Sequence, residues 1–428
     1  AVAPGNLFVA LAGARDGHAY VEAARRAGAT GALVSRPSPG PAVRVGDTLS
    51  ALGDMAVAAR RRAVRTRRAA ITGSVGKTSV TQAVLSALKR AGDGHGPVKS
   101  FNNHIGVPLT LARMPATTER AVFELGMNHA GEIAPLSRLV CPHVAAITNV
   151  EAVHVENFPD GVAGVARAKA EIFAGLEPGG VAVLNADSAH YGFLSEAALA
   201  AQATVRSFGV AEGADARLQG SAVGGAGTIV EATVDGQRVA YRLRQNGAHW
   251  GSMSLCALLV LQALGVERSA ALLALASFEP LAGRGAVHSR VGPNGPFLLV
   301  DESYNASPVS VRAALTGLPR RSPNGRRLVA LTDMLELGSE AAALHAELRR
   351  PIIASEIAKV YCAGPLMRSL WDGLPAAVRG AWAASAAELA PTVAEAVQAG
   401  DIIMVKGSNA SKASLVVEAL LAMSEAGE

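Results

Sequence analysis

The sequence has 428 residues, of which 50% are hydrophobic and 18% are charged, and its formal net charge is +5. This length and composition indicate a globular protein of about three domains and exclude a disordered chain. The positive charge is slight and dispersed, so nucleic acid is not an expected partner. The densest basic run, residues 60–68, is interpreted as a solvated helix face rather than a polyanion site.

The first part of the chain, residues 1–67, is expected to form a small α/β domain. Within it, Asp16-Gly17-His18 is compatible both with a plain turn and with a ligand contact. The predicted elements are strands at residues 7–11 and 31–34, helices at 20–27 and 47–65, and a proline-rich loop at 36–41.

The second part, residues 68–283, alternates buried apolar runs with helical patterns, which predicts a parallel sheet built from βαβ units. Residues 217–244 instead alternate apolar and polar side chains around Asp235-Gly236, so a small antiparallel ribbon is expected there. The expected parallel strands are residues 70–73, 121–125, 144–149 and 181–185, and helices are expected at 251–264 and 269–276.

The third part, residues 284–428, follows a glycine-rich joint at Gly283-Arg284-Gly285. Its strands and helices alternate again, which predicts a second doubly wound, Rossmann-like domain. The expected strands are residues 297–300, 328–332, 359–362 and 402–405.

The three cysteines, Cys141, Cys256 and Cys362, show neither metal-binding spacing nor a disulfide framework. This fits a reducing compartment, and a cytoplasmic protein is expected. The most apolar helical stretch, Leu255–Val266, is too short to cross a bilayer, so membrane insertion is not expected. The sequence opens at Ala1 in mid-pattern without an initiator Met, and a segment is expected to be missing at the front.

The strongest functional signal lies at the start of the second part. A strand leads into glycines and then into a helix, as in a phosphate-binding loop, where backbone N–H groups, a helix N-terminus and a lysine surround an anion. The usual spacing would place a glycine at Ile71, but here the first glycine is Gly73. The residues expected to bind phosphate are Thr72, Gly73, Ser74, Val75, Gly76, Lys77, Thr78 and Ser79.

Further polar residues follow the strands of the second part. Glu124 ends a strand and is expected to hold Mg²⁺ together with the Thr78 hydroxyl, the alternative being a solvated glutamate. His154, Lys169 and the pair Asn102-Asn103 are weak signals when each is taken alone.

Three polar loops follow strands of the third part. Residues 301–306 offer Asp301 for a ribose, Tyr304 for a base and Asn305 as a donor. Each loop is compatible with a plain connection, but three at the carboxyl ends of one sheet favour a shared ligand site. The other two loops are residues 333–338 and 406–408.

Taken together, these motifs resemble the Mur ligase family, the amino-acid ligases of bacterial cell-wall synthesis. Phe101-Asn102-Asn103 stands where the preceding ligase of that pathway carries a Thr-Thr-Pro run, so the D-alanyl-D-alanine-adding branch is the most similar one. The stretches that carry the resemblance are residues 72–79, 101–108, 124–133, 168–173, 185–187, 301–306 and 333–338.

The resemblance implies an ADP-forming ligase with three domains, which bind the UDP-sugar, ATP and the incoming dipeptide in chain order. It implies ATP-dependent addition of D-Ala-D-Ala to UDP-N-acetylmuramoyl-tripeptide through an acyl phosphate, for peptidoglycan synthesis. A monomer is expected. ATP and Mg²⁺ are the implied cofactors.

The implied residue roles follow from the matching motifs. Lys77 would bind the β- and γ-phosphates, Thr78 and Glu124 one Mg²⁺, and Asn103 the γ-phosphate. His154 would support a second Mg²⁺, and Lys169 matches the lysine that becomes a metal-binding carbamate. From the third domain, Arg284 and Asp301 would reach the nucleotide, with Tyr304 and Asn305 near the base.

Two departures leave alternatives open. The family usually has a strand and an Asp-Ser-Arg segment before Pro4, and an Asn where this chain has Met253. A sibling ligase that adds another amino acid is one alternative. A nucleotide-binding module that is inactive because its front is missing is the other.

Overall fold

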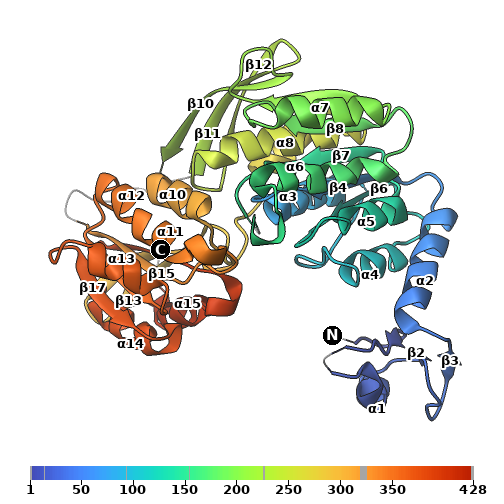
Figure 1. The fold of residues 1–428 in the computed structure, drawn as a ribbon, viewed down its shortest axis with the longest axis horizontal. Coiled ribbons are helices and arrows are strands. Elements are labelled where there is room, and N and C mark those ends of the chain that lie inside the picture. Colours follow the sequence, from blue (N-terminus) through green and yellow to red (C-terminus); the bar gives the residue numbers. More distant parts are fainter. Residues whose placement is uncertain are drawn as a thin grey trace.

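The computed structural model describes residues 2–13, 15–92, 94–153, 155–224, 227–318 and 325–425. These residues form three sheets that follow one another along the chain, and Figure 1 shows the three corresponding units from blue to red. The predicted three-part α/β architecture is confirmed.

The first unit is a parallel sheet in the order β1-β2-β3. It packs on α1 through a small apolar core that includes Ala10, Val21 and Val34. The sequence did not predict β3, because its three residues are all exposed and form no apolar run. The elements are β1 (Leu7–Val9), η1 (Gly17–Tyr20), α1 (Val21–Arg26), β2 (Gly31–Val34), β3 (Ala42–Arg44) and α2 (Thr48–Arg62), the helix that leads to the next unit.

The second unit is a nine-stranded sheet in the order β12-β11-β10-β9-β8-β7-β4-β6-β5. Strands β4 to β9 pair in parallel, as predicted, and β10 continues the sheet into an antiparallel ribbon with β11 and β12. The strands are β4 (Arg67–Thr72), β5 (Gly94–His95), β6 (Arg120–Glu124), β7 (Val144–Ile147), β8 (Val181–Asn185), β9 (Thr204–Gly209), β10 (Ala216–Gly224), β11 (Gly227–Val234) and β12 (Gln237–Leu243).

The ribbon turns where the sequence predicts. Asp235 and Gly236 have φ values of +51° and +75°, which is the left-handed backbone that a tight two-residue hairpin requires. Asp-Gly tolerates this conformation better than most residue pairs, so the local sequence sets the register of β11 against β12.

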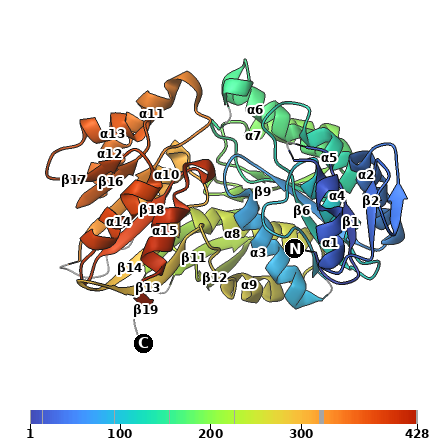
Figure 2. The same cartoon turned by 90° about the horizontal axis from the view of Figure 1, so that it is seen from below.

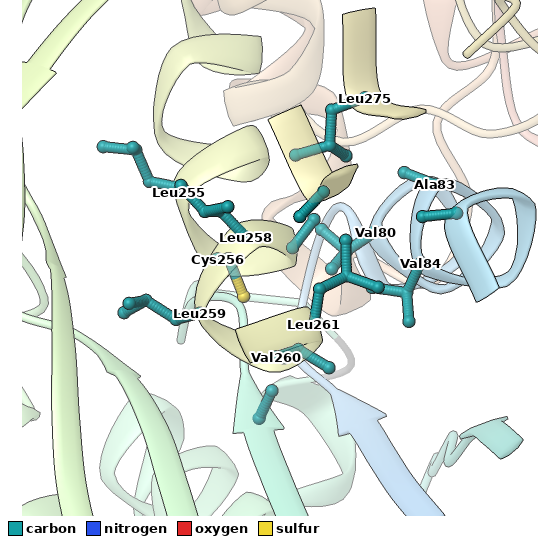
Figure 3. Close-up of a cluster of buried hydrophobic side chains, with 14 of the residues drawn as sticks. Val80, Ala83, Val84, Leu255, Cys256, Leu258, Leu259, Val260, Leu261 and Leu275 are labelled. Atoms are coloured by element: carbon teal, nitrogen blue, oxygen red, sulfur yellow. The ribbon is translucent and has the colours of Figure 1, made fainter. Parts of the chain in front are cut away.

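Helices cover both faces of the central sheet. On one face lie α3, α8 and α9, and Figure 3 shows how Val80 and Val84 of α3 meet Leu258 and Leu261 of α8. Residues 254–261 of α8 are all buried, as expected for a helix that is apolar on every side. The helices are α3 (Lys77–Ala91), α8 (His249–Ala263) and α9 (Arg268–Ala276) on this face and α4 (Gly106–Ala112), α5 (Ile133–Val140), α6 (Gly161–Ala170) and α7 (Tyr191–Ala200) on the other, with η2 (Val155–Asn157) and η3 (Glu171–Gly175) between them.

The third unit is a seven-stranded sheet in the order β17-β16-β15-β18-β14-β13-β19, with an apolar core on each face. Figure 2 shows this unit beside the central one. Its strands are β13 (Ala286–Gly292), β14 (Gly295–Glu302), β15 (Arg327–Thr332), β16 (Lys359–Ala363), β17 (Arg379–Ala383), β18 (Ile402–Lys406) and β19 (Ser424–Glu425). Its helices are α10 (Pro308–Gly317), η4 (Gly338–Glu340), α11 (Ala341–Glu347), α12 (Arg349–Ala354), α13 (Met367–Gly373), α14 (Ala386–Ala396), η5 (Asn409–Ser411) and α15 (Ser414–Leu421).

Within the ranges given above, no helix has the length and apolar content that crossing a bilayer requires. The three cysteines are free thiols, and Cys256 and Cys362 are buried.

Candidate active site

The phosphate loop joins β4 to α3 and depends on two glycines with positive φ. Gly73 has φ +147°, and a Cβ there would lie 1.9 Å from the Thr148 hydroxyl oxygen. Gly76 has φ +83°, and a Cβ there would lie 2.6 Å from Cε of Met253 on α8. A larger residue at Gly73 would collide with Thr148, so the irregular glycine spacing fits the local packing. At Gly76 the constraint is the positive φ, because the flexible end of Met253 can move aside.

The end of β7 holds the loop in place. Asn149 accepts a hydrogen bond from Val75 N at its side-chain oxygen (2.9 Å) and from Ser74 N at its carbonyl (3.1 Å). The Thr148 hydroxyl donates to the Val75 carbonyl (2.6 Å). Lys77 Nζ donates to the Gly73 carbonyl (2.6 Å), so the lysine lies over the loop that it is predicted to serve.

Glu124 forms an acidic centre beside this loop. Its side chain is buried, with the residue 1% exposed, and Oε1 accepts hydrogen bonds from Ser100 Oγ (2.9 Å) and Asn102 Nδ2 (2.7 Å). Ser100 Oγ also lies 3.0 Å from Thr78 Oγ1. Oε2 is buried and has no hydrogen-bond partner within the described ranges, which is unusual for a carboxylate oxygen.

This arrangement fits a magnesium ion. Mg²⁺ is commonly bound by one or two carboxylates together with substrate phosphates, and Glu124 and Thr78 offer a carboxylate and a hydroxyl. No group of three or more His, Cys, Asp or Glu side chains with metal-binding geometry occurs among the residues that the structure describes. A metal here would complete its coordination with oxygen atoms of the nucleotide and of water.

Lys169 lies on α6 and is 3% exposed. Burial, reinforced by the charge of Lys77, lowers the pKa of its amine well below the usual lysine value. It has no ion-pair or hydrogen-bond partner among the described residues. A buried amine that is readily neutral suits chemical modification better than a structural ion pair. His154, the other predicted metal residue of this region, lies outside the described residues.

Arg284 enters the site from the joint before β13. Its guanidinium stacks on the Tyr304 ring at 3.9 Å from the ring centroid. Burial lowers the pKa of Lys77; Glu124 opposes this effect, and the positive charge of Arg284 adds to it. Residues of the third unit thus lie close enough to the phosphate loop to act on it electrostatically.

Asp301 occupies a different place from the predicted one. Its Oδ2 accepts a hydrogen bond from Gly283 N (2.7 Å), and its Oδ1 accepts from Ser303 N (3.1 Å) and Ser303 Oγ (2.6 Å). The carboxylate therefore fixes the joint and does not line the cavity. The next residue, Glu302, lines it instead and pairs with buried Lys406 (3.1 Å).

Of the pair Asn102-Asn103, the residue that lines the cavity is again the neighbour of the predicted one. Asn103 is exposed, and its side-chain oxygen accepts hydrogen bonds from Ile105 N and Gly106 N at the start of α4. Asn102 lines the cavity and bonds to Glu124.

The candidate site lies in one cavity of about 590 Å³. It brings together most of the predicted residues, namely Ser74, Val75, Gly76, Lys77, Thr78, Ser79, Glu124, Arg284, Tyr304 and Asn305. Thr72, Gly73, Asn103, Lys169 and Asp301 do not line it. Ser408 of the loop 406–408, which was expected at a shared ligand site, also lines the cavity. Lining residues that the sequence did not indicate include Ser100, Asn128, Asn149, His249 and Trp250. Of these, Asn149 had a usable signal, because it follows the end of a central strand.

The chain matches two family models, the Mur ligase middle domain over residues 71–261 and the Mur ligase glutamate ligase domain over residues 283–409. It is also 31% identical over 426 residues to the UDP-N-acetylmuramoyl-tripeptide–D-alanyl-D-alanine ligase of Rickettsia prowazekii, covering 97% of this chain and 92% of that protein. The chain belongs to the Mur ligase family.

Solved structures agree with this assignment to the Mur ligases. A crystal structure of MurF from Acinetobacter baumannii matches with a TM-score of 0.85 and 28% identity, covering 98% of this chain and 91% of that one. The MurF ligase of Thermotoga maritima, solved in complex with ADP, matches with a TM-score of 0.82 and 25% identity, covering 98% and 95%. The ligase function expected from the sequence is thus confirmed at the level of the family.

Proposed function

We propose that this Mur ligase joins D-alanyl-D-alanine to UDP-N-acetylmuramoyl-tripeptide, with ATP converted to ADP and phosphate, as a step of peptidoglycan precursor synthesis. The observation that carries the proposal is the shared cavity, which is lined by the phosphate loop of the central unit and by Arg284 and Tyr304 of the third unit. The names of the similar proteins supply the substrates.

The reaction needs activation because a carboxylate is a poor electrophile. The tripeptide carboxylate oxygen attacks the γ-phosphorus of ATP, ADP leaves, and an acyl phosphate forms. The dipeptide amine then attacks the acyl carbon, phosphate leaves, and the amine loses a proton. Exclusion of water protects the acyl phosphate, which suits a site between two domains.

The residues of the chain supply binding and charge. Lys77 and the loop N–H groups would hold the β- and γ-phosphates, and Arg284 would approach from the opposite wall. Glu124 and Thr78 would hold Mg²⁺, which offsets phosphate charge when bound.

Lys169 fits a second role. Its lowered pKa favours a neutral amine, which can react with CO₂ to form a carbamate, and the resemblance makes this carbamate, with His154, a support for a second Mg²⁺. The first unit would hold the UDP-sugar, in keeping with the order of domains in the family.

The test is ADP release with purified protein, ATP and Mg²⁺. ADP formation should require both UDP-N-acetylmuramoyl-tripeptide and D-Ala-D-Ala, and the product should contain a new peptide bond by mass spectrometry. Equal turnover without the dipeptide, or with a single amino acid in its place, would overturn the proposal.

A further inference from the structure

Ser100, in the loop between β5 and α4, lies between the two side chains that fit a magnesium ion. Its Oγ is 2.9 Å from Glu124 Oε1 and 3.0 Å from Thr78 Oγ1. Asn102 Nδ2 joins the same group, at 3.3 Å from Ser100 Oγ and 2.7 Å from Glu124 Oε1. All four residues line the large cavity, and we call them the Ser100 network.

The direction of each hydrogen bond in the Ser100 network follows from the chemistry of its members. A carboxylate only accepts, so the Ser100 hydroxyl donates its one hydrogen to Glu124 Oε1. The Ser100 oxygen has two lone pairs, and the two donors that reach it are Asn102 Nδ2 and Thr78 Oγ1. The Thr78 hydroxyl is therefore the donor to Ser100, and the lone pairs of its own oxygen are left for another partner.

Two acceptors of the Ser100 network thus remain open. One is the Thr78 oxygen, and the other is Glu124 Oε2, which is buried and has no hydrogen-bond partner within the described ranges. In a network that served packing alone this carboxylate oxygen would be paired, as buried polar atoms almost always are. A hydroxyl oxygen and a carboxylate oxygen left open beside a phosphate loop are ligands that Mg²⁺ accepts.

The main chain holds one side of the Ser100 network rigidly. Gly126 N donates to the Asn102 carbonyl (2.8 Å), and a Cβ on Gly126 would lie 2.8 Å from Asn102 Cγ. The missing side chain at Gly126 therefore leaves room for the Asn102 amide, whose two hydrogens are directed to Glu124 and Ser100. Glu124 Oε1 is thus held by two donors, whereas Ser100 is the one side chain within the described ranges that bonds to the Thr78 hydroxyl.

We propose that Ser100 is a positioning residue for the metal ligands. It takes the hydrogen of the Thr78 hydroxyl, so that the Thr78 oxygen presents a lone pair to Mg²⁺, and it binds Oε1 of Glu124, which leaves Oε2 for the same ion. The position needs a group that donates once and accepts twice, which a hydroxyl does and a methyl group or an ammonium does not. The inference rests on the proposed use of ATP with Mg²⁺.

The test measures metal binding directly. The probe is Mn²⁺, which favours the same oxygen ligands as Mg²⁺ and is followed by EPR, in a complex with an ATP analogue whose β,γ-bridging oxygen is replaced by a methylene group. Ser100→Ala should raise the Kd of Mn²⁺ by about tenfold or more, because residues that orient metal ligands have effects of this size. Affinity for the analogue in EDTA should stay unchanged, because the phosphate loop keeps its own hydrogen bonds to Asn149 and Thr148.

Two control variants separate the hydroxyl from a general effect of substitution. Ser100→Thr keeps one donor and two acceptors and should retain most of the Mn²⁺ affinity. Ser277→Ala also removes a serine hydroxyl of the central unit, one that donates to the Ala274 carbonyl (2.9 Å), but it lies outside the large cavity. It should leave the Mn²⁺ affinity unchanged.

A double variant tests whether Ser100 acts through Thr78. Thr78→Val removes the hydroxyl that Ser100 orients and should itself weaken Mn²⁺ binding. In that background Ser100→Ala should weaken it further by less than about threefold, because the effects of residues that share one interaction do not add and Asn102 still holds Glu124.

An unchanged Mn²⁺ affinity in Ser100→Ala would overturn the inference. So would a loss that recurs in full in the Thr78→Val protein, or one that appears equally for the analogue in EDTA. Because the analogue is not cleaved and the sugar nucleotide and dipeptide are left out, the result does not depend on ligase activity. A protein that binds metal through this network but forms no peptide bond would refute the proposed function alone.

Discussion

Replacement of Gly73 by alanine tests how the phosphate loop is built. The residue has φ +147°, and the added methyl group would lie 1.9 Å from Thr148 Oγ1, whose hydroxyl bonds to the Val75 carbonyl at 2.6 Å. Backbone strain at such a position costs about 1–3 kcal/mol. The displaced hydrogen bond adds about 1 kcal/mol. The free energy of unfolding should therefore fall by about 2–4 kcal/mol, and ATP affinity should fall with it.

Urea unfolding followed by tryptophan fluorescence measures the stability change, and titration with ATP measures the binding. Gly179→Ala is the matched control, because Gly179 also has a positive φ (+72°) but a Cβ there meets nothing within 4 Å. It should cost about 1–2 kcal/mol and leave ATP affinity unchanged.

A second substitution isolates the collision. Thr148→Ala removes the hydroxyl, so in that background Gly73→Ala should lower the free energy of unfolding by at least about 1 kcal/mol less than in the unchanged protein. Thr148→Ser keeps the oxygen and should leave the cost of Gly73→Ala unchanged. Equal costs at Gly73 and Gly179, with no relief from Thr148→Ala, would show that the loop does not depend on this contact.

Three other substitutions probe the site and the third unit. Lys77→Ala should lower turnover about a hundredfold or more in the ADP-release assay, as for other charge-stabilising groups, and a loss below fivefold would contradict its placement at the phosphates. Glu302→Leu should cost about 3 kcal/mol in urea unfolding, because it leaves the buried Lys406 ammonium without a carboxylate and with only the Asn305 carbonyl to accept from it, and Lys406→Met in the same protein should recover most of that loss. His345 is fully buried and burial lowers its pKa, so the unfolded state binds the proton first as pH falls below about 6.5, and the free energy of unfolding drops by at most about 1.4 kcal/mol per pH unit. His345→Gln, which keeps a donor and an acceptor but does not titrate, should flatten the dependence between pH 7.5 and 5.5, and an unchanged slope would refute this reading.

The sequence predicted the central strands well because they are apolar runs buried on both faces. Residues 181–185 and 31–34 match the observed strands at both ends. The strands that the sequence did not predict are β3, β5, β9, β13, β17 and β19, and all of these except β9 lie at or near the edges of their sheets. Residues such as Arg379-Gly380-Ala381 carry no such pattern, and only pairing with β16 makes them a strand.

The site was predicted at the level of segments and less well at the level of single residues. Side chains of successive strand residues point to opposite faces of the sheet, so of two neighbouring residues only one can face the cavity. Asp301 ends up on the joint while Glu302, the next residue of β14, faces the cavity. Asn102 takes the place expected for Asn103 for another reason: both lie in a loop, and Asn103 bonds to backbone N–H groups at the start of α4. His249 and Trp250 were not predicted as site residues, although the comparison with the family singled out Met253 on the same helix; all three line the cavity.

The geometry around Asp301 explains how the third unit presents its residues to the phosphate loop. Asp301 binds Gly283 and Ser303 through one carboxylate, and this holds the joint and the loop after β14 together. Arg284 and Tyr304 stack on each other within that frame, and Glu302 is tied to Lys406 of β18. These groups must therefore move as one body if the unit shifts relative to the central sheet. The phosphate loop, in contrast, is held by the residues after β7, so the distance from Lys77 to Arg284 depends on how the third unit is placed against the central sheet. We therefore expect the loop to hold the phosphates from the central unit, and the charge that stabilises transfer to be complete only when both units meet.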